Sequence, residues 1–316
     1  MRVSIERVCV VGGGVIGSLF AAHLSRVADV WVLTRRPEHA RALEEQGLAV
    51  SGRAEFTGRV HATEDAAALP DVDVAIVATK GTAVDEAAGA LAGHVPGAMV
   101  VTVQNGLGAE QLVRRHGDWP LVSGVTFMSG TRHDDTHVEY ILDTETWLGP
   151  YNGIPYERVE ELAELIRQSG LKARAFPDLK PAQWSKLIFN ATVNAVAALT
   201  GLPHDPHFAD ESTPAGLGHL VHALVDEGKA VAAAAGIELY EDPWEMNVLA
   251  TQRGSAHYPS MLEDVEAHRP TEIELITGSL VREADRLGVP APLHSTLYRL
   301  IKAKEDSYRE SEGRQG

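Results

Sequence analysis

The chain has 316 residues, of which 44% are hydrophobic and 23% charged, and its 28 basic and 44 acidic residues give a formal net charge of -16. This length exceeds what one hydrophobic core usually serves, so two domains are expected. The acidic balance argues against nucleic acid as a partner, and no apolar run is long enough to span a membrane. The single cysteine, Cys9, permits no intrachain disulfide; with no targeting signal read in the sequence, we expect a cytoplasmic protein.

Short β-branched runs alternate with helix-like stretches in the first half of the chain. This alternation is typical of βαβ units around a parallel sheet. The later strands end in polar residues, Thr79-Lys80 and Gln104-Asn105-Gly106, and ligands of open α/β sheets bind outside such carboxyl ends. The predicted elements are strands at 7–11, 29–33, 73–78 and 98–103, a helix at 18–27, antiparallel strands at 137–142 and 146–148, and a helix at 156–168.

After Pro177 the pattern becomes almost purely helical. The sequence therefore predicts an α/β doubly wound domain over residues 1–178 and an all-α domain over residues 179–316. The charged end of the chain, 302–316, is expected to fray. The helices predicted in the second domain cover 181–200, 215–235, 243–252 and 271–287.

A glycine-rich turn follows the first predicted strand. Gly12, Gly14 and Gly17 fit the pattern G-x-G-x-x-G between a strand and a helix, with Gly13, Val15 and Ile16 between them. The first glycine allows the tight turn, the second lets backbone approach a pyrophosphate, and the third lets the helix pack closely. The turn predicts a dinucleotide site, and the alternative is a glycine-rich turn without a ligand.

Two arginines stand where the second strand ends. A dinucleotide-binding protein that prefers NAD usually has an acidic residue there, which binds the ribose 2′-hydroxyl. This sequence has Arg35 and Arg36 instead. Guanidinium groups suit a 2′-phosphate, so the sequence favours NADP(H). The alternative is that one or both arginines are solvated surface charges.

Lys186, Asn190 and Asn194 recur at i, i+4, i+8 spacing, so they share one face of the helix predicted over 181–200. No charged residue occurs from Leu187 to Gly201, which is typical of a buried helix rather than a solvated one. Buried amides and an ammonium group need partners. The partner is either a polar ligand or a structural network within the core.

Other polar residues have no decisive local signature. Glu272 is predicted in the first turn of a helix after Pro270, where the helix dipole alone favours a carboxylate. Ser260, Asn105 and Lys80 are as compatible with turn or surface positions. The histidines fit no metal-binding spacing, and no nucleophile elbow is present, so neither a metal site nor nucleophilic catalysis is expected.

In this order the motifs resemble those of the ketopantoate reductases (2-dehydropantoate 2-reductases), over nearly the whole chain. The resemblance implies a Rossmann domain, a helical domain and a substrate cleft between them. It also implies NADPH-dependent reduction of ketopantoate to (R)-pantoate, on the route to pantothenate and coenzyme A. The motifs are Gly12 to Gly17, Arg35, Ala78-Thr79-Lys80, Gln104-Asn105-Gly106, Trp184 to Asn190 with Asn194, Ser260 to Asp264 and Thr271-Glu272-Ile273.

The resemblance also implies a role for each polar residue. Lys186 would protonate the ketone oxygen as hydride arrives, and Glu272 would hydrogen-bond the substrate hydroxyl. Asn194 and Ser260 would hold the substrate and Asn190 would support it. Lys80 and Asn105 would lie on the cofactor and substrate side of the Rossmann domain.

One residue departs from the pattern of relatives, which often have an asparagine where this chain has His257. Other readings therefore stay open: an NADP-dependent reductase of another 2-oxo or 3-hydroxy acid, such as the 6-phosphogluconate and hydroxyisobutyrate dehydrogenases, or a non-catalytic NADP(H) sensor. The expected partner is a small 2-oxo acid, and the sequence allows a monomer or a homodimer.

Overall fold

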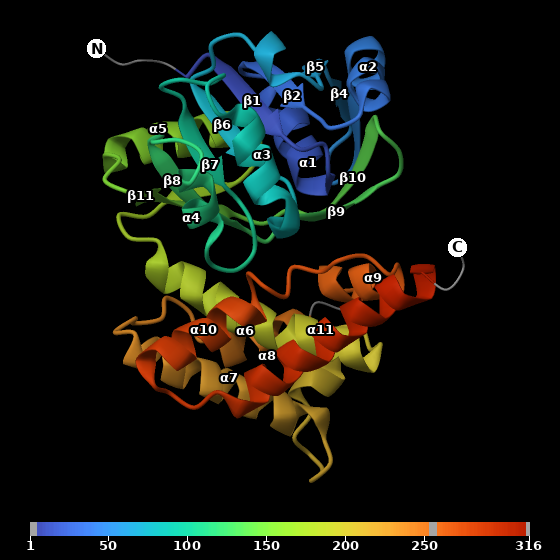
Figure 1. Ribbon diagram of the computed structural model, residues 1–316, viewed down its shortest axis with the longest axis vertical. Coiled ribbons are helices and arrows are strands. Elements are labelled where there is room, and N and C mark those ends of the chain that lie inside the picture. The colour runs from blue at the N-terminus through green and yellow to red at the C-terminus, as the bar shows by residue number, and fades with distance from the viewer. Residues whose placement is uncertain (1–4, 253–257, 314–316) are drawn as a thin grey trace. The chain divides into compact units, whose positions relative to one another are not determined.

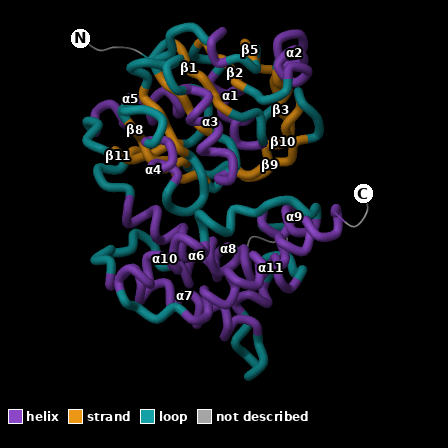
Figure 2. Tube along the Cα trace, viewed as in Figure 1, coloured by secondary structure: helices purple, strands orange, loops and turns teal. Residues whose placement is uncertain are grey.

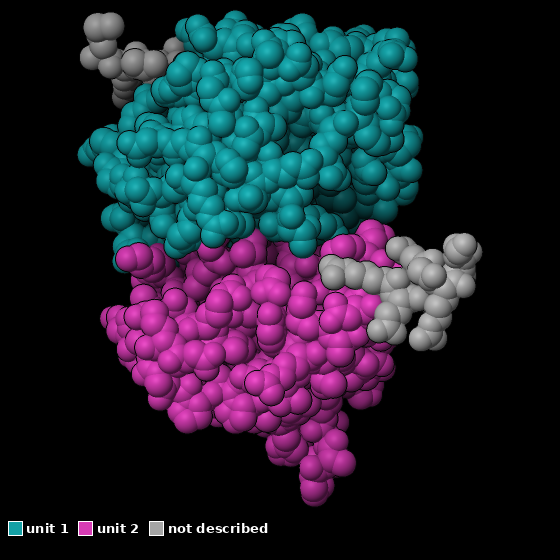
Figure 3. All heavy atoms as spheres, in the orientation of Figure 1, with its two compact units in different colours: residues 1–104, 109–179 teal, residues 105–108, 180–316 magenta. Residues whose placement is uncertain are grey.

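The computed structural model describes residues 5–252 and 258–313, and Figure 1 labels its β-strands and helices. The described chain forms two compact units (Figure 3). Unit 1 contains residues up to Gln104 and Ala109–Leu179; unit 2 contains Asn105–Gly108 and the chain from Lys180 onward. The two domains expected from the sequence, residues 1–178 and residues 179–316, stay a prediction.

An eight-stranded sheet forms the centre of unit 1, and all described strands lie in this unit (Figure 2). Its strands are parallel except for one antiparallel pair, β8 with β11. The order β5-β2-β1-β6-β7-β8 reproduces the doubly wound arrangement, with its switch point between β1 and β6. In sheet order the strands are β12 (Ala173–Ala175), β11 (Thr146–Tyr151), β8 (Leu121–Thr126), β7 (Met99–Thr102), β6 (Val74–Val77), β1 (Arg7–Val11), β2 (Asp29–Leu33) and β5 (His61–Thr63).

Alternation along β1 shows how helices cover both faces of this sheet. Val8 and Val10 belong to the core formed with α1 and α5, whereas Cys9 and Val11 belong to the core formed with α3 and α4. Successive strand residues point to opposite faces, so an entirely apolar strand is buried on both sides. The helices of unit 1 are α1 (Val15–Leu24), α2 (Pro37–Gln46), α3 (Val84–Leu91), α4 (Ala109–Arg114) and α5 (Tyr156–Gln168).

Cys9 is fully buried in this core, as expected for a small core residue. Burial raises the pKa of its thiol to about 12, so the thiol stays protonated and unreactive at neutral pH.

A second sheet in unit 1 has the order β4-β3-β10-β9. Strand β10 pairs in parallel with β3 and antiparallel with β9, so it does not pair with β11, and the two late strands predicted to close the domain lie in different sheets. Strands β9 and β10 form a hairpin whose loop lies against the glycine-rich turn. The strands are β3 (Leu48–Gly52), β4 (Phe56–Gly58), β9 (Ser129–Arg132) and β10 (His137–Leu142).

Helix α6 (Lys180–Thr200) is the centre of unit 2, where it packs against each of the other α-helices. It is buried nearly all round, as the absence of charge after Lys186 predicts. The predicted frayed end is wrong as far as Gly313, because the last helix continues to that residue. The other helices are α7 (Leu217–Ala234), α8 (Pro243–Thr251), α9 (Ser260–Glu266), α10 (Thr277–Leu287) and α11 (Pro292–Gly313). Short 3-10 helices are η1 (Ala66–Ala68) and η2 (Gly81–Ala83) in unit 1 and η3 (Pro206–Ala209) in unit 2. Among the described residues no helix is long and apolar enough to cross a bilayer.

The three turn glycines differ in what surrounds them, which predicts different costs of substitution. A Cβ at Gly17 would overlap the carbonyl oxygen of Gly12, whereas a Cβ at Gly14 would enter open space. Gly17→Ala should therefore lower the free energy of unfolding by about 3 kcal/mol, because rigid backbone must shift. Gly14→Ala should cost about 1 kcal/mol at most, as expected at a helix N-cap. Urea unfolding of both variants checks this difference, and equal losses would contradict it.

Candidate active site

Three polar side chains lie along α6, at the positions that helical spacing predicts. Lys186, Asn190 and Asn194 are 6%, 7% and 7% exposed, respectively, in a helix that carries no charge after Lys186. A buried ammonium group is costly unless polar groups compensate for its lost hydration. The surroundings of Lys186 therefore decide what this helix can do.

Asn105 connects the polar groups of unit 2. Its Oδ1 accepts hydrogen bonds from Nζ of Lys186 at 2.8 Å and from Nδ2 of Asn190 at 3.3 Å. Its Nδ2 donates to Oε2 of Glu272 at 3.2 Å. One amide thus holds an ammonium group with its oxygen and a carboxylate with its nitrogen.

A short loop brings Asn105 into this unit. The amide of Leu107 donates to the carbonyl oxygen of Leu275 at 2.8 Å. Gly106, between Asn105 and Leu107, has φ +92°. A Cβ at Gly106 would overlap that same carbonyl, so only glycine fits here. The resemblance places Asn105 on the cofactor and substrate side of the Rossmann domain. In the structure its segment groups with unit 2, whose residues are its side-chain partners, and its role in binding stays a prediction.

Burial controls the acidity of Lys186. Desolvation lowers the pKa of its ammonium group to about 7, while the negative charge of Glu272 acts in the opposite direction. At neutral pH both protonation states of this lysine are accessible. Such a group can give or take a proton with little free-energy cost.

Glu272 is not in the first turn of a helix, so the helix-dipole explanation for it is wrong. It lies in a turn before α10, which begins at Thr277. Thr271 anchors this turn, because its backbone amide and hydroxyl both donate to Oε1 of Glu305, at 2.8 and 2.7 Å. The turn then aims the Glu272 carboxylate at Asn105.

The remaining predicted substrate residues are less closely joined to this group. Asn194 makes no side-chain hydrogen bond to any described residue, although it is buried. Ser260 is the first residue of α9 and is exposed, and its hydroxyl makes no hydrogen bond to the residues that the structure describes. His257 lies outside the described residues. In the described part of the chain no three acidic, histidine or cysteine side chains are placed to hold a metal ion.

The glycine-rich turn of unit 1 has the geometry that a pyrophosphate requires. Gly12 has φ +102° after β1, and Gly14 is the N-cap of α1, with open space where its Cβ would be. The first amides of α1, including those of Val15 and Ile16, have no partner within the helix. A cradle without side chains, lined by unused amide donors, fits a dinucleotide phosphate.

Further unused polar atoms lie at the carboxyl ends of the neighbouring strands. Gln104 donates from Nε2 to the carbonyl oxygens of Val77 and Thr79, at 2.7 and 2.9 Å, which ties the ends of β6 and β7 together. Its Oε1 and the Thr79 hydroxyl are buried and have no partner in the described chain. Lys80 follows as the exposed N-cap of η2. Orphaned polar atoms at this edge also fit a polar ligand.

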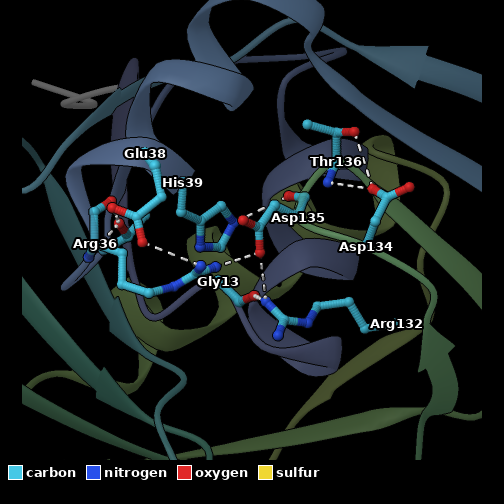
Figure 4. Close-up of polar contacts among 9 residues, drawn as sticks. Gly13, Arg36, Glu38, His39, Arg132, Asp134, Asp135 and Thr136 are labelled. Atoms are coloured by element: carbon cyan, nitrogen blue, oxygen red, sulfur yellow. Dashed lines mark hydrogen bonds and ion pairs between the residues drawn. The ribbon is translucent and has the colours of Figure 1, made fainter.

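The two arginines after β2 differ in their surroundings. The Arg35 side chain is 78% exposed, with Oε2 of Glu86 at 3.7 Å from its Nη1. Arg36 is ion-paired with Glu38 at 3.2 Å and with Asp135, which comes from the loop between β9 and β10 (Figure 4). The alternative hypothesis from the sequence, a solvated surface arginine, therefore describes Arg35 better than Arg36.

Sequence reasoning missed the residues that this loop brings to the turn. Arg132, Asp135 and the buried His39 all contact the glycine-rich turn or Arg36. Their sequence signal is weak, because a charged run between two strands is usually a solvated hairpin. The pairing of β10 with β3, together with the packing of β9 and β10 on α1, brings that hairpin to the turn.

Comparison with known proteins assigns the family. The Ketopantoate reductase PanE/ApbA model matches residues 8–153, and the model of its C-terminal part matches residues 178–305. The 2-dehydropantoate 2-reductase of Archaeoglobus fulgidus is 28% identical over 306 residues, covering 95% of this chain and 98% of the relative. The chain belongs to the ketopantoate reductase PanE/ApbA family and is an oxidoreductase of that family.

Solved structures agree with this assignment. The 2-dehydropantoate 2-reductase of Geobacter metallireducens GS-15 is 28% identical, with a TM-score of 0.86 over 94% of this chain and 99% of that one. A D-mandelate dehydrogenase, solved with NADH and anilino(oxo)acetate, has a TM-score of 0.87 at 23% identity, covering 96% and 100% of the two chains. The second comparison shows a shared fold alone.

The loop at Gly106 predicts a severe effect of a single methyl group. Gly106→Ala should lower the free energy of unfolding by about 3 kcal/mol, because positive φ and an overlap with Leu275 add together. Gly93→Ala is the matched control, since Gly93 has φ +80° but open space around it, and should cost about 1 to 2 kcal/mol. Urea unfolding compares the two variants. Equal losses would show that the contact with Leu275 contributes nothing.

Proposed function

We propose that this protein is an NADPH-dependent 2-dehydropantoate 2-reductase, reducing ketopantoate to (R)-pantoate for pantothenate and coenzyme A synthesis. The observation that carries the proposal is the hydrogen-bonded group of Lys186, Asn105 and Glu272, in a chain of this family. A buried lysine whose pKa lies near 7, next to a carboxylate, supplies a proton donor and a hydroxyl acceptor together.

The proton step is assigned to Lys186. Reduction of a ketone places negative charge on its oxygen, and an ammonium group both stabilises and protonates that oxygen. Asn105 holds one side of Nζ by accepting its hydrogen bond, so the other N–H groups have a fixed direction. Burial favours the neutral amine, which makes release of the proton easy.

The other residues bind and orient the substrate. Glu272 would accept a hydrogen bond from the substrate hydroxyl, while Asn194 and Ser260 would hold the substrate and Asn190 would support Asn105. A bound nicotinamide dinucleotide would supply the hydride. The glycine-rich turn with Val15, Ile16 and Lys80 would hold it, and Arg35 and Arg36 favour a cofactor with a 2′-phosphate.

A competing substrate is another 2-oxo acid, since a chain of the same fold is a D-mandelate dehydrogenase. Ketopantoate and 3,3-dimethyl-2-oxobutanoate differ by one hydroxyl, so they test the role of Glu272 directly. Steady-state NADPH oxidation should favour ketopantoate in kcat/KM by about 100-fold or more, because an acceptor left unpaired penalises the deoxy analogue. Equal values for the two acids would reject the substrate, and faster turnover of phenylglyoxylate would favour the competing one.

Replacement of the proposed acid should separate catalysis from binding. Lys186→Ala should lower kcat by at least about 100-fold, as expected for loss of a general acid, with NADPH affinity nearly unchanged. Lys172→Ala is the control, because this exposed lysine lies in unit 1, where it forms an ion pair with Asp143 of the same unit. Stopped-flow turnover and equilibrium titration measure the two effects. Turnover surviving at the wild-type rate in Lys186→Ala would contradict the assignment of the general acid, whereas NADPH binding without turnover in the wild-type protein would favour a non-catalytic NADP(H) sensor.

The pKa of Lys186 sets the expected pH dependence. Burial lowers this pKa to about 7, far below the ordinary value for lysine, so the ammonium form is lost as the pH rises through about 7. The rate of reduction should therefore fall above that pH, while the reverse oxidation, which needs the neutral amine as base, should rise. In Glu272→Gln the midpoint should move to lower pH, because the charge that favours the ammonium group is gone. A midpoint unmoved by this change would contradict the assignment.

A further inference from the structure

The loop between β9 and β10 is fixed against the glycine-rich turn. Arg132 Nη1 donates to the carbonyl oxygen of Gly13 at 3.4 Å, and His39 Nε2 lies 3.0 Å from the carbonyl oxygen of Asp135 (Figure 4). Burial lowers the pKa of His39, so the ring is neutral at pH 7. A carbonyl oxygen can only accept, which places the proton on Nε2.

The carboxylate of Asp135 lies between two guanidinium groups. Arg36 donates to it from Nη2, and Arg132 donates from Nη1 at 3.3 Å. The second terminal nitrogen of Arg36 donates to Glu38 Oε1 at 3.2 Å. Both terminal nitrogens of Arg36 are therefore already bound to carboxylates.

The charges around the end of β2 nearly cancel. The three guanidinium groups of Arg35, Arg36 and Arg132 are matched by three carboxylates. A ribose 2′-phosphate carries about 1.5 to 2 negative charges, so it meets repulsion from these carboxylates as well as attraction. The positive charge available to a 2′-phosphate is therefore smaller than the two arginines in the sequence suggest.

Among these carboxylates, Asp135 is held most firmly. Its side chain is 29% exposed and receives two guanidinium groups, and its own carbonyl is bound by His39. Glu38 and Glu86 have side chains 62% and 68% exposed, so they can turn into solvent, where salt screens them.

We infer that Asp135 is a specificity-determining residue of the cofactor site, which weakens the preference for a 2′-phosphate over a 2′-hydroxyl. A sheet that prefers NAD carries its acidic residue at the end of the second strand. Here the carboxylate of Asp135 reaches the end of β2 from the hairpin of β9 and β10, and it lies beside Arg36, an arginine that favours NADP(H). The inference rests on the proposed function, because it concerns the same dinucleotide site.

The test compares two nucleotides that differ only by the 2′-phosphate, 5′-AMP and adenosine 2′,5′-bisphosphate. Calorimetric titration gives their dissociation constants for the full chain at pH 7 and low ionic strength. In Asp135→Asn the ratio of the 5′-AMP constant to the bisphosphate constant should rise about tenfold, as expected for removal of one like charge nearby.

Asp134→Asn is the matched control. Asp134 carries the same charge on the same loop, but its Oδ1 accepts from the amide and hydroxyl of Thr136, at 2.7 and 3.0 Å, rather than from an arginine. Its ratio should change by less than about twofold, because solvent and salt screen a charge that faces away.

Each outcome decides the inference. An unchanged ratio in Asp135→Asn overturns it. A lower ratio also overturns it, because Asp135 would then orient Arg36 for the phosphate. An equal rise in Asp134→Asn overturns it as well, because the effect would not be specific to Asp135. If Asp135→Asn does not fold, Glu38→Gln at the exposed partner of Arg36 should raise the ratio to a smaller extent, and no rise overturns the inference. If neither nucleotide binds the wild-type protein, the proposed function fails as well; binding of both with an unmoved ratio rejects this inference alone.

Discussion

The burial of one ammonium group determines much of the helical unit. Lys186 sits in a helix that is apolar nearly all round, and a charge there is tolerated only with a polar partner. Asn105 is that partner, and it reaches Lys186 because Gly106 lets the loop pass directly against Leu275. A glycine in one segment thus supports the burial of an ammonium group 80 residues later.

At both proposed sites, the proton donor and the cofactor site, neighbouring residues change the strength of a charged group. Burial makes the Lys186 ammonium group a stronger acid, and Glu272 limits that effect. At the glycine-rich turn Asp135 and Glu38 occupy the terminal nitrogens of Arg36. In each case the type of residue suggests a simple role, and its partners change the strength of that role.

The sequence predicted the parts of this molecule that depend on local pattern. β1, β2, β10 and α5 have the predicted bounds, because their apolar periodicity is clean. The face of α6 that carries Lys186 follows from helical spacing alone. The glycine-rich turn was predicted from its context between a strand and a helix, and the open space at Gly14 agrees with it.

Tertiary pairing decided what local pattern could not. The helix predicted from residue 271 begins at Thr277, because Thr271 is held by Glu305 in a turn. The partners of Asn105 depend on a backbone hydrogen bond to Leu275, and those of Arg36 on a loop about 100 residues later. Neither contact can be predicted from the local amino-acid composition.

The allocation of residues 105–108 has a consequence for how the gene can be divided. This segment belongs to unit 2, yet it is bounded on both sides by chain of unit 1. A fragment encoding only residues 180–316 would contain Lys186, Asn190 and Glu272 but not the amide that joins them. The hydrogen-bonded group proposed for catalysis is therefore not encoded by one continuous segment, and a fragment that retains it has to include the Asn105 loop as well as α6.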